Sequence, residues 1–313
     1  MSGKNKVVIV SDIHMADPDF PASQKSRFIG FLNEFVKEEA AELILLGDIF
    51  ELSQRRMAIV YEECLDVLMK LLEVANCGTE ITYLLGNHDF TISDVRGFNL
   101  IPHPNITVRL ARDRYLPVRK YVGKGGEDTR KAGAEKIPTS ACFRTLQGKR
   151  VFLAHGHEFN HYFRGNPQRF DSVIRAAGIL EEISPTLDDR LLGSVDRLRS
   201  GIYNLLYSSN TPGRVGMAPD ELEFLLAARD ICKFSVTEEG ELKEREESDR
   251  IDYVFFGHTH VQQGPVELRD EILGNSGKVW GTYYNTGTWV IMKKRADYTV
   301  IEPDGSVNSL QWE

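Results

Sequence analysis

The clearest pattern along the chain is a short apolar run that ends in a cluster of polar side chains, and it occurs five times. Each run is too short for a helix and rich in Val, Ile, Leu or aromatic residues, which is typical of a buried strand. The five predicted strands are Val7 to Val10, Leu43 to Leu46, Ile81 to Leu85, Val151 to Ala154 and Tyr253 to Phe256. The polar clusters follow their carboxyl ends, where open α/β sheets bind ligands.

Two amphipathic segments separate the first three predicted strands. Apolar residues recur at helical spacing from Phe28 to Val36 and again from Ile59 to Leu72, before Gly78. Strands that alternate with helices in this way predict right-handed crossovers and a parallel sheet. A further helix is predicted from Pro219 through Ile231, because proline and acidic residues favour a first turn.

The middle of the chain has a different texture. The short β-rich runs Ile106 to Leu110 and Cys142 to Leu146 suggest antiparallel strands, and Gln147-Gly148 is a plausible hairpin turn. Residues 123–136, with several glycines among charges, are predicted to form a loop.

Residues 159–216 are predicted to be helical segments broken by glycines and prolines, with arginines interspersed. We interpret them as an inserted helical lid within one domain of residues 1–313. The insert leaves the core next to His155, so it is expected either to cover the site and select the substrate or to be a surface excursion without substrate contact.

Charge and composition narrow the function. A net charge of −8 and a pI near 5.6 oppose extended nucleic-acid binding, which depends on Lys and Arg. Residues 109–150 hold twelve Lys or Arg against four Asp or Glu, either as a solvated surface or as a rim that attracts an anionic substrate.

The cysteines and the N-terminus favour a soluble, cytoplasmic protein. The four cysteines have no CxxC spacing and are interpreted as reduced thiols. No apolar stretch resembles a signal peptide or approaches the ~20 residues needed to span a bilayer. Nothing in the sequence indicates an oligomeric state.

The polar clusters predict a metal site. Six of the eight histidines lie in them, together with Asp and Asn side chains and without any cysteine. A single DxH or HxH is weak evidence, whereas five such segments in series are much stronger. This mixed oxygen and nitrogen ligand set suits Mn, Fe, Zn or Co, with Mn preferred, rather than a structural zinc or a calcium site.

The ordered motifs DxH (Asp12 to His14), GDxxE (Gly47 to Glu51), GNHD (Gly86 to Asp89), HGH and GHTH resemble the calcineurin-like metallophosphoesterase superfamily. The resemblance implies an α/β sandwich of two mixed β-sheets flanked by helices, with two divalent metal ions at the strand ends. It also implies a ligand for each motif: Asp12, His14 and His260 for one metal, Asn87, His155 and His258 for the other, and Asp48 between both.

The charges of such a site predict its chemistry. Two divalent ions bring four positive charges, whereas Asp12 and Asp48 supply only two negative ones. The site therefore stays electropositive and attracts a phosphoryl group. A metal lowers the pKa of bound water from about 16 toward 7, which predicts hydroxide attack on phosphorus. By its motif, His88 is the expected general acid for the leaving group. Glu51 resembles the carboxylate that orients this histidine; Asp89 is the alternative, or it caps the following turn.

The motifs predict the reaction class better than the substrate. The expected activity is hydrolysis of a phosphomonoester or phosphodiester, small or lipid-linked. The GDIFE and GNHDF segments and the arginine-bearing insert also resemble UDP-2,3-diacylglucosamine hydrolases, although those enzymes commonly carry arginine at the position of His88 and aspartate at that of His157. A non-catalytic scaffold of the same fold is the alternative from another class.

Overall fold

A computed structural model describes most of the chain. The described residues are 3–17, 22–52, 55, 57–90, 92, 102–120, 131–159, 219–272, 276–289 and 296–313. Apart from Phe159, the predicted lid of residues 159–216 lies outside them. Among the described residues, no helix has both the length and the apolar character needed to cross a bilayer.

The first layer is a six-stranded mixed sheet with the order β15-β14-β1-β2-β3-β4. Its strands are β1 (Lys6–Val10), β2 (Ala40–Leu46), β3 (Glu80–Leu84), β4 (Ile106–Arg109), β14 (Asp297–Ile301) and β15 (Val307–Gln311). Strands β1 to β4 are parallel, and β14 and β15 are antiparallel additions at one edge. Three of the five predicted strands are thereby confirmed.

The second layer is a five-stranded mixed sheet with the order β12-β13-β11-β8-β7. Its strands are β7 (Cys142–Leu146), β8 (Lys149–Leu153), β11 (Tyr253–Phe256), β12 (Gln263–Glu271) and β13 (Ser276–Asn285). The predicted hairpin turn at Gln147-Gly148 joins β7 to β8, which pair antiparallel. Strand β11 lies parallel to both β8 and β13.

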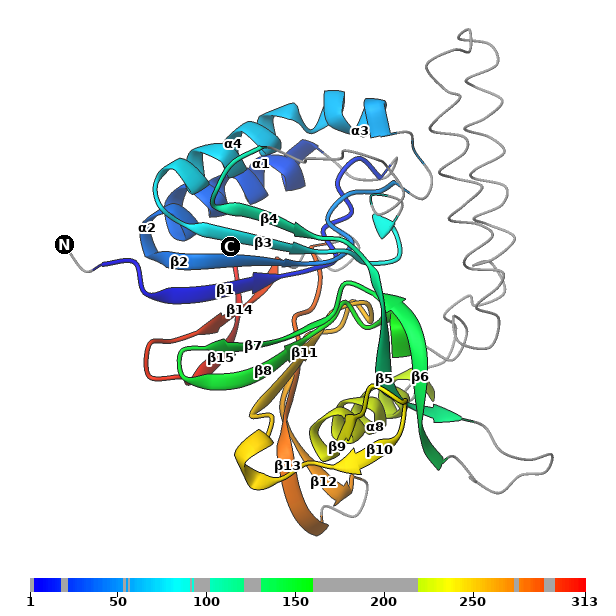
Figure 1. The fold of residues 1–313 in the computed structure, drawn as a ribbon. Helices are drawn as coiled ribbons and strands as arrows, with labels where there is room; N and C mark the ends of the chain where they lie inside the picture. The colour runs from blue at the N-terminus through cyan, green and yellow to red at the C-terminus, as the bar shows by residue number, and fades with distance from the viewer. Residues whose placement is uncertain are drawn as a thin grey trace, which may run out of the picture.

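The two sheets pack face to face as a sandwich, and helices cover their outer faces (Figure 1). Because side chains alternate along a strand, Val7 and Ile9 of β1 join the core between the sheets, whereas Val8 and Val10 face the helices. Burial on both sides explains why these strands read as continuous apolar runs. The fold class expected from the resemblance is confirmed.

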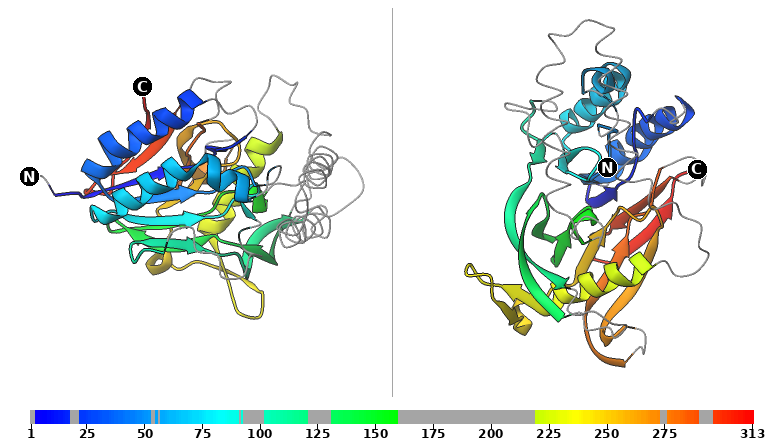
Figure 2. Two further views of the ribbon diagram at one scale, coloured as in Figure 1. Left: turned by 90° about the horizontal axis from the view of Figure 1, so that it is seen from above. Right: turned by 90° about the vertical axis from the view of Figure 1, so that its right-hand side faces the viewer.

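The helices over the first sheet come from the two predicted amphipathic segments. They are α1 (Ala22–Phe31), the π-helical turn η1 (Leu32–Val36), α2 (Lys37–Glu39), α3 (Met57–Glu63) and α4 (Leu65–Asn76). Figure 2 shows α1 and α4 lying side by side above the strands. Helix α8 (Pro219–Lys233) covers the second sheet and confirms the predicted start at Pro219.

Two expectations for the middle of the chain are wrong. Strand β4 pairs parallel with β3, because the twenty-one residues from Leu85 to Asn105 are long enough for a crossover. Residues 131–136 of the predicted loop belong to a strand, since β5 (Arg112–Lys120) pairs with β6 (Lys131–Thr139), and residues 123–130 lie outside the described residues. The remaining elements are short: η3 (His157–Phe159), β9 (Phe234–Val236), β10 (Leu242–Glu244) and η6 (Glu247–Asp249).

Candidate metal centre

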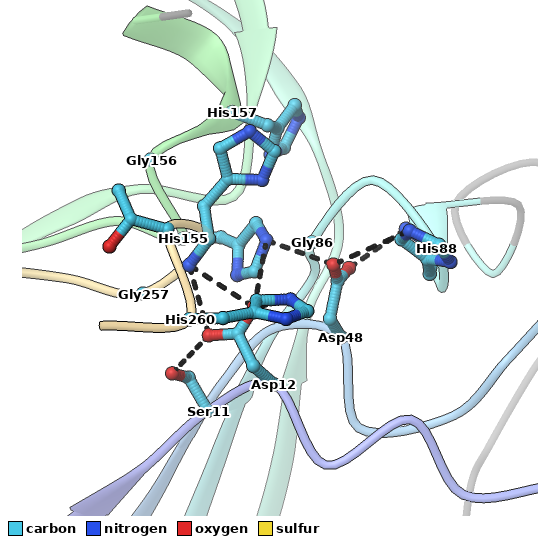
Figure 3. A network of polar contacts seen from close by, with 12 residues as sticks. Ser11, Asp12, Asp48, Gly86, His88, His155, Gly156, His157, Gly257 and His260 are labelled. Atoms are coloured by element: carbon cyan, nitrogen blue, oxygen red, sulfur yellow. Dashed lines mark hydrogen bonds and ion pairs between the residues drawn. The ribbon is translucent and has the colours of Figure 1, made fainter. Parts of the chain in front are cut away.

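The residues predicted as ligands lie together at one edge of the sandwich. They follow the carboxyl ends of β1, β2, β3, β8 and β11. These ends meet because β1, β2 and β3 run parallel in one sheet, while β8 and β11 run parallel in the other. Figure 3 shows Asp12, Asp48, His155 and His260 turned toward a common space.

The backbone of this edge is strained. Five predicted ligands have φ in the left-handed region: 52° at Asp12, 53° at His14, 53° at Asp48, 68° at His258 and 57° at His260. Residues other than glycine rarely adopt these angles, which cost roughly 1–3 kcal/mol each and cluster at functional sites. The strain turns each side chain sharply out of its strand direction.

The loops that carry these residues are bonded to one another. The backbone N–H groups of Ile13 and His14 both donate to the carbonyl of Asp48, each at 2.9 Å. A Cβ at Gly86 would overlap the Asp48 carboxylate, so the Gly86-Asn87 turn approaches the Asp48 loop only because glycine stands there.

The first cluster contains Asp12, His14 and His260. Asp12 Oδ1 lies 3.2 Å from His260 Nε2 and 4.0 Å from His14 Nε2. The two Nε2 atoms are 3.2 Å apart. The other oxygen of Asp12 accepts hydrogen bonds from the Ser11 hydroxyl and, at 2.9 Å, from the His258 N–H. One carboxylate oxygen and two imidazole nitrogens therefore converge as a cation requires.

The second cluster contains Asp48, Asn87, His155 and His258. His155 Nδ1 donates to the Leu46 carbonyl at 3.0 Å, an arrangement typical of metal-binding histidines, because it leaves Nε2 as the ligand atom. His155 Nε2 lies 3.1 Å from Asp48 Oδ2 without hydrogen-bond geometry. Among the described residues, the buried Oδ1 of Asn87 also has no hydrogen-bond partner. The ligand atoms of Asp48, His155 and His258 lie close enough together to hold a divalent cation.

The electrostatics favour a positive charge at this position. Burial would raise the pKa of Asp12, but His155 and His260 outweigh it and hold that pKa at about 2. Burial alone would lower the pKa of His155, but the carboxylates of Asp48 and Asp12 raise it to about 10. Without metal, a proton on His155 therefore supplies the positive charge that a cation would otherwise bring.

A family model described as calcineurin-like phosphoesterase matches residues 5–262. The chain belongs to this family. It is therefore a metal-dependent phosphoric ester hydrolase, and together with the ligand clusters the family supports a site for two divalent metal ions. The family also implies a small-molecule phosphoester as the substrate class.

Among solved structures, the chain is similar to a dimetal phosphatase from Danio rerio. The two chains share 10% sequence identity over 99% of each, with a TM-score of 0.42. This likeness is too low to transfer a substrate or a residue role. No match was found among curated proteins.

In this phosphoesterase, His88 lies beside the clusters and is held by two carboxylates. Its Nδ1 is 2.5 Å from Glu51 Oε2, and its backbone N–H donates to Asp48 Oδ1 at 2.8 Å. Burial lowers the pKa of His88, but Glu51 and Asp48 raise it to about 9. The same Glu51 oxygen lies 3.5 Å from His14 Nδ1. Glu51 therefore contacts both His88 and His14.

Asp89 contacts other groups. Its carboxylate accepts the Gly86 N–H at 2.6 Å, the Ile49 N–H at 2.9 Å and the Tyr83 hydroxyl at 2.5 Å. Burial and the nearby Asp48 raise its pKa to about 6. In the described part of the chain the Asp89 carboxylate makes no contact with the His88 ring, so Glu51 is the better candidate for the orienting role. The positions of the following turn that Asp89 was expected to cap, Thr91 and Ser93, lie outside the described residues.

In this phosphoesterase, residues at and just after the end of β13 are hydrogen-bonded to the loops that carry the ligands. The Ser11 and Thr286 hydroxyls are 2.6 Å apart, and the Thr288 hydroxyl donates to the Asp12 carbonyl at 3.1 Å. Asn285 Nδ2 donates to the Gly257 carbonyl at 2.7 Å. Ser11 was not predicted to contribute to the site, although it directly precedes Asp12.

Behind the second cluster, His157 is buried 5.6 Å from the His155 ring, with its Nδ1 3.5 Å from Glu158 Oε2. Burial lowers its pKa. Among the described residues, His157 belongs to none of the groups of ligand atoms that lie close enough together to hold a cation.

Proposed function

We propose that this protein hydrolyses a phosphomonoester or phosphodiester at a centre that holds two divalent cations. The proposed ligands form two sets joined by one carboxylate: Asp12, His14 and His260 for the first ion, Asn87, His155 and His258 for the second, and Asp48 for both. The observation that carries the proposal is a pair of buried ligand atoms, Asn87 Oδ1 and His155 Nε2, that have no hydrogen-bond partner among the described residues, with His155 Nε2 only 3.1 Å from Asp48 Oδ2. A buried polar atom without a partner is destabilising unless something else binds it.

The ligand chemistry supports Mn²⁺ as the first candidate, with Fe, Zn or Co as alternatives. The set combines carboxylate and amide oxygens with imidazole nitrogens and contains no thiolate, which suits these borderline and hard ions. All four cysteines are free thiols, and the three in the interior lie in the hydrophobic core clusters. A cytoplasmic location stays a prediction.

The chain's own residues supply the remaining steps of hydrolysis. When bound, the two cations would polarise the phosphoryl oxygens and activate water as the nucleophile. His88 gives its Nε2 proton to the leaving oxygen, and Glu51 holds Nδ1 so that Nε2 faces the centre. The raised pKa of His88, about 9 without metal, keeps this proton available at neutral pH.

The proposed substrate is a small or lipid-linked phosphoester. The net charge of −8 disfavours long nucleic acids, because the protein as a whole repels the phosphate backbone. Substrate selection by the insert stays a prediction, because residues 160–216 lie outside the described part of the chain.

The test is to strip the purified protein with a chelator, reload it with Mn²⁺ and measure metal content and turnover. Nitrophenyl phosphate represents phosphomonoesters, bis-nitrophenyl phosphate represents phosphodiesters, and a nucleoside diphosphate sugar represents pyrophosphates. We expect two Mn²⁺ per chain and turnover of a mono- or diester, and loss of both in Asp48→Ala. Two bound ions without turnover of any ester would favour the scaffold, and absence of metal binding would overturn the proposal.

A further inference from the structure

One buried carboxylate outside the ligand set connects the two loops on which the proposed centre depends. Asp89 accepts the N–H of Gly86, at 2.6 Å, through one oxygen and the N–H of Ile49, at 2.9 Å, through the other. Gly86 directly precedes Asn87, and Ile49 directly follows Asp48. The position of one carboxylate therefore sets the spacing of both loops.

The hydroxyl of Tyr83 fixes that carboxylate. It donates to Asp89 Oδ2 at 2.5 Å, from a ring that is fully buried on β3 and packs against Phe50 at 6.3 Å between ring centroids. Strand β3 is hydrogen-bonded on both sides, by β2 and β4, so the hydroxyl is presented by a rigid element. Asp89 thus accepts hydrogen bonds from three donors, namely two backbone N–H groups and one side-chain hydroxyl.

We propose that Tyr83 is a positioning residue, whose hydroxyl acts through Asp89 to hold the Asp48 and Asn87 loops at the spacing that the proposed metal centre needs. The inference rests on the proposed function, since it concerns the same centre. Groups behind a ligand commonly change metal affinity or activity by about 10–100-fold when they are removed.

The spacing matters most at the contact between Asp48 and His88. Asp48 Oδ1 accepts the His88 N–H at 2.8 Å, so the shared ligand and the proton donor are joined across the two loops. If Asp89 turned, the Gly86 turn would be released from the Asp48 loop, and Asn87 and His88 would shift together. A displacement of about 1 Å can lower turnover by about 10²-fold.

The decisive variant is Tyr83→Phe, which removes the hydroxyl and keeps the ring that packs on Phe50. Its matched control is Tyr253→Phe, since the Tyr253 hydroxyl also makes one hydrogen bond, at 2.9 Å to the Gly305 carbonyl. Tyr253 begins β11, at the opposite end of the strand from His258. Both variants lose one tyrosine hydroxyl, but only one faces the loops of the centre.

The measurements are Mn²⁺ affinity by calorimetry, kcat and KM at fixed and at saturating Mn²⁺, and the thermal midpoint in chelator. For Tyr83→Phe we expect one of the two Mn²⁺ ions to bind about 10–100-fold more weakly. We also expect kcat to fall about tenfold at fixed Mn²⁺ and to recover in part at saturating Mn²⁺, with KM changing little. Tyr253→Phe should keep the affinity and kcat of the wild type.

A second variant tests the same hydrogen bond from the side of Asp89. Asp89→Asn keeps the size of the side chain but turns an amide toward an N–H donor, so it should weaken the same Mn²⁺ ion at least as much as Tyr83→Phe does. Wild-type affinity and kcat in Tyr83→Phe, or a change only in the chelator midpoint equal to that of Tyr253→Phe, would overturn the inference and leave the proposed function intact. A wild type that binds no Mn²⁺ would instead remove the proposed function.

Discussion

Two buried polar clusters lie between the same two sheets, and they are completed in different ways. At the metal edge, carboxylates and imidazoles face one another, and Asn87 Oδ1 and His155 Nε2 have no hydrogen-bond partner among the described residues. Elsewhere between the sheets, Glu42 of β2 accepts hydrogen bonds from Arg144 of β7 and, at 2.7 Å, from Thr82 of β3. The cluster at the metal edge needs a cation, whereas the Glu42 cluster is complete within the protein.

The difference separates function from stability. The Glu42 cluster contains one negative and one positive group, and the three residues forming it have ordinary backbone angles. The metal edge combines negative charge, converging lone pairs and left-handed backbone, all of which oppose folding unless a ligand binds. Loss of a residue of the metal edge should therefore change catalysis, and loss of a residue of the Glu42 cluster should change stability.

The largest expected effect is that of His88→Asn, which removes the proposed proton donor. We expect kcat to fall by about 10²–10⁴-fold while two metal ions per chain remain bound. The fall should be larger for an alkyl phosphate than for a nitrophenyl phosphate, because the nitrophenolate leaves without protonation. Metal content and turnover of both esters measure this, and loss of metal in parallel with activity would show that His88 is instead a ligand or a structural residue.

A smaller effect is the pH dependence of stability in the metal-free protein. The pKa values of His88, about 9, and of His155, about 10, exceed the unfolded value of 6.5. Between the unfolded and the folded pKa values, the folded state therefore binds more protons than the unfolded state. The contribution of the two histidines is present in full below the unfolded pKa and falls as the pH rises through the folded values, by on the order of 2 kcal/mol for each histidine between about pH 7 and 8.5.

Metal binding should remove much of this dependence, because the cation replaces the proton on His155. At a hundredfold excess over Kd, one bound ion should also stabilise the fold by about 2.7 kcal/mol. Urea denaturation at several pH values, with Mn²⁺ and with chelator, measures both effects. The same pH slope in both forms would argue against His155 as a ligand.

The sequence was enough to predict the ends of the strands that carry the metal edge. Apolar runs report burial directly, and Asp12, Asp48 and His155 follow such runs within two residues. This short distance between strand and ligand makes these positions visible without any long-range information. The arrangement of two mixed sheets came from the resemblance of the motifs, and residues 160–216 remain a prediction.

The partners of buried polar groups were not predictable in the same way. Tyr83 lies inside an apolar run and reads as a core residue, so its hydroxyl bond to Asp89 was missed. Glu42 and Arg144 are 102 positions apart, and no local pattern connects them. The parallel pairing of β4 was missed for the same reason, because periodicity indicates which face of a strand is buried but not which strand lies beside it.

The smallest effect concerns the complete cluster. Arg144→Met should leave metal content and kcat unchanged but lower the free energy of unfolding by about 2 kcal/mol, because Glu42 loses its positive partner. This value lies below that of a fully buried pair, since the Arg144 side chain is 28% exposed and solvent screens part of its charge. Urea denaturation of the metal-loaded protein measures the loss.

The double variant Glu42→Leu with Arg144→Met tests whether the charge, rather than the side-chain volume, is responsible. It removes the buried carboxylate together with its partner, so it should recover most of the stability that Arg144→Met loses. An unchanged loss in the double variant would mean that packing of Arg144 between the sheets, and not its pairing with Glu42, stabilises this part of the sandwich.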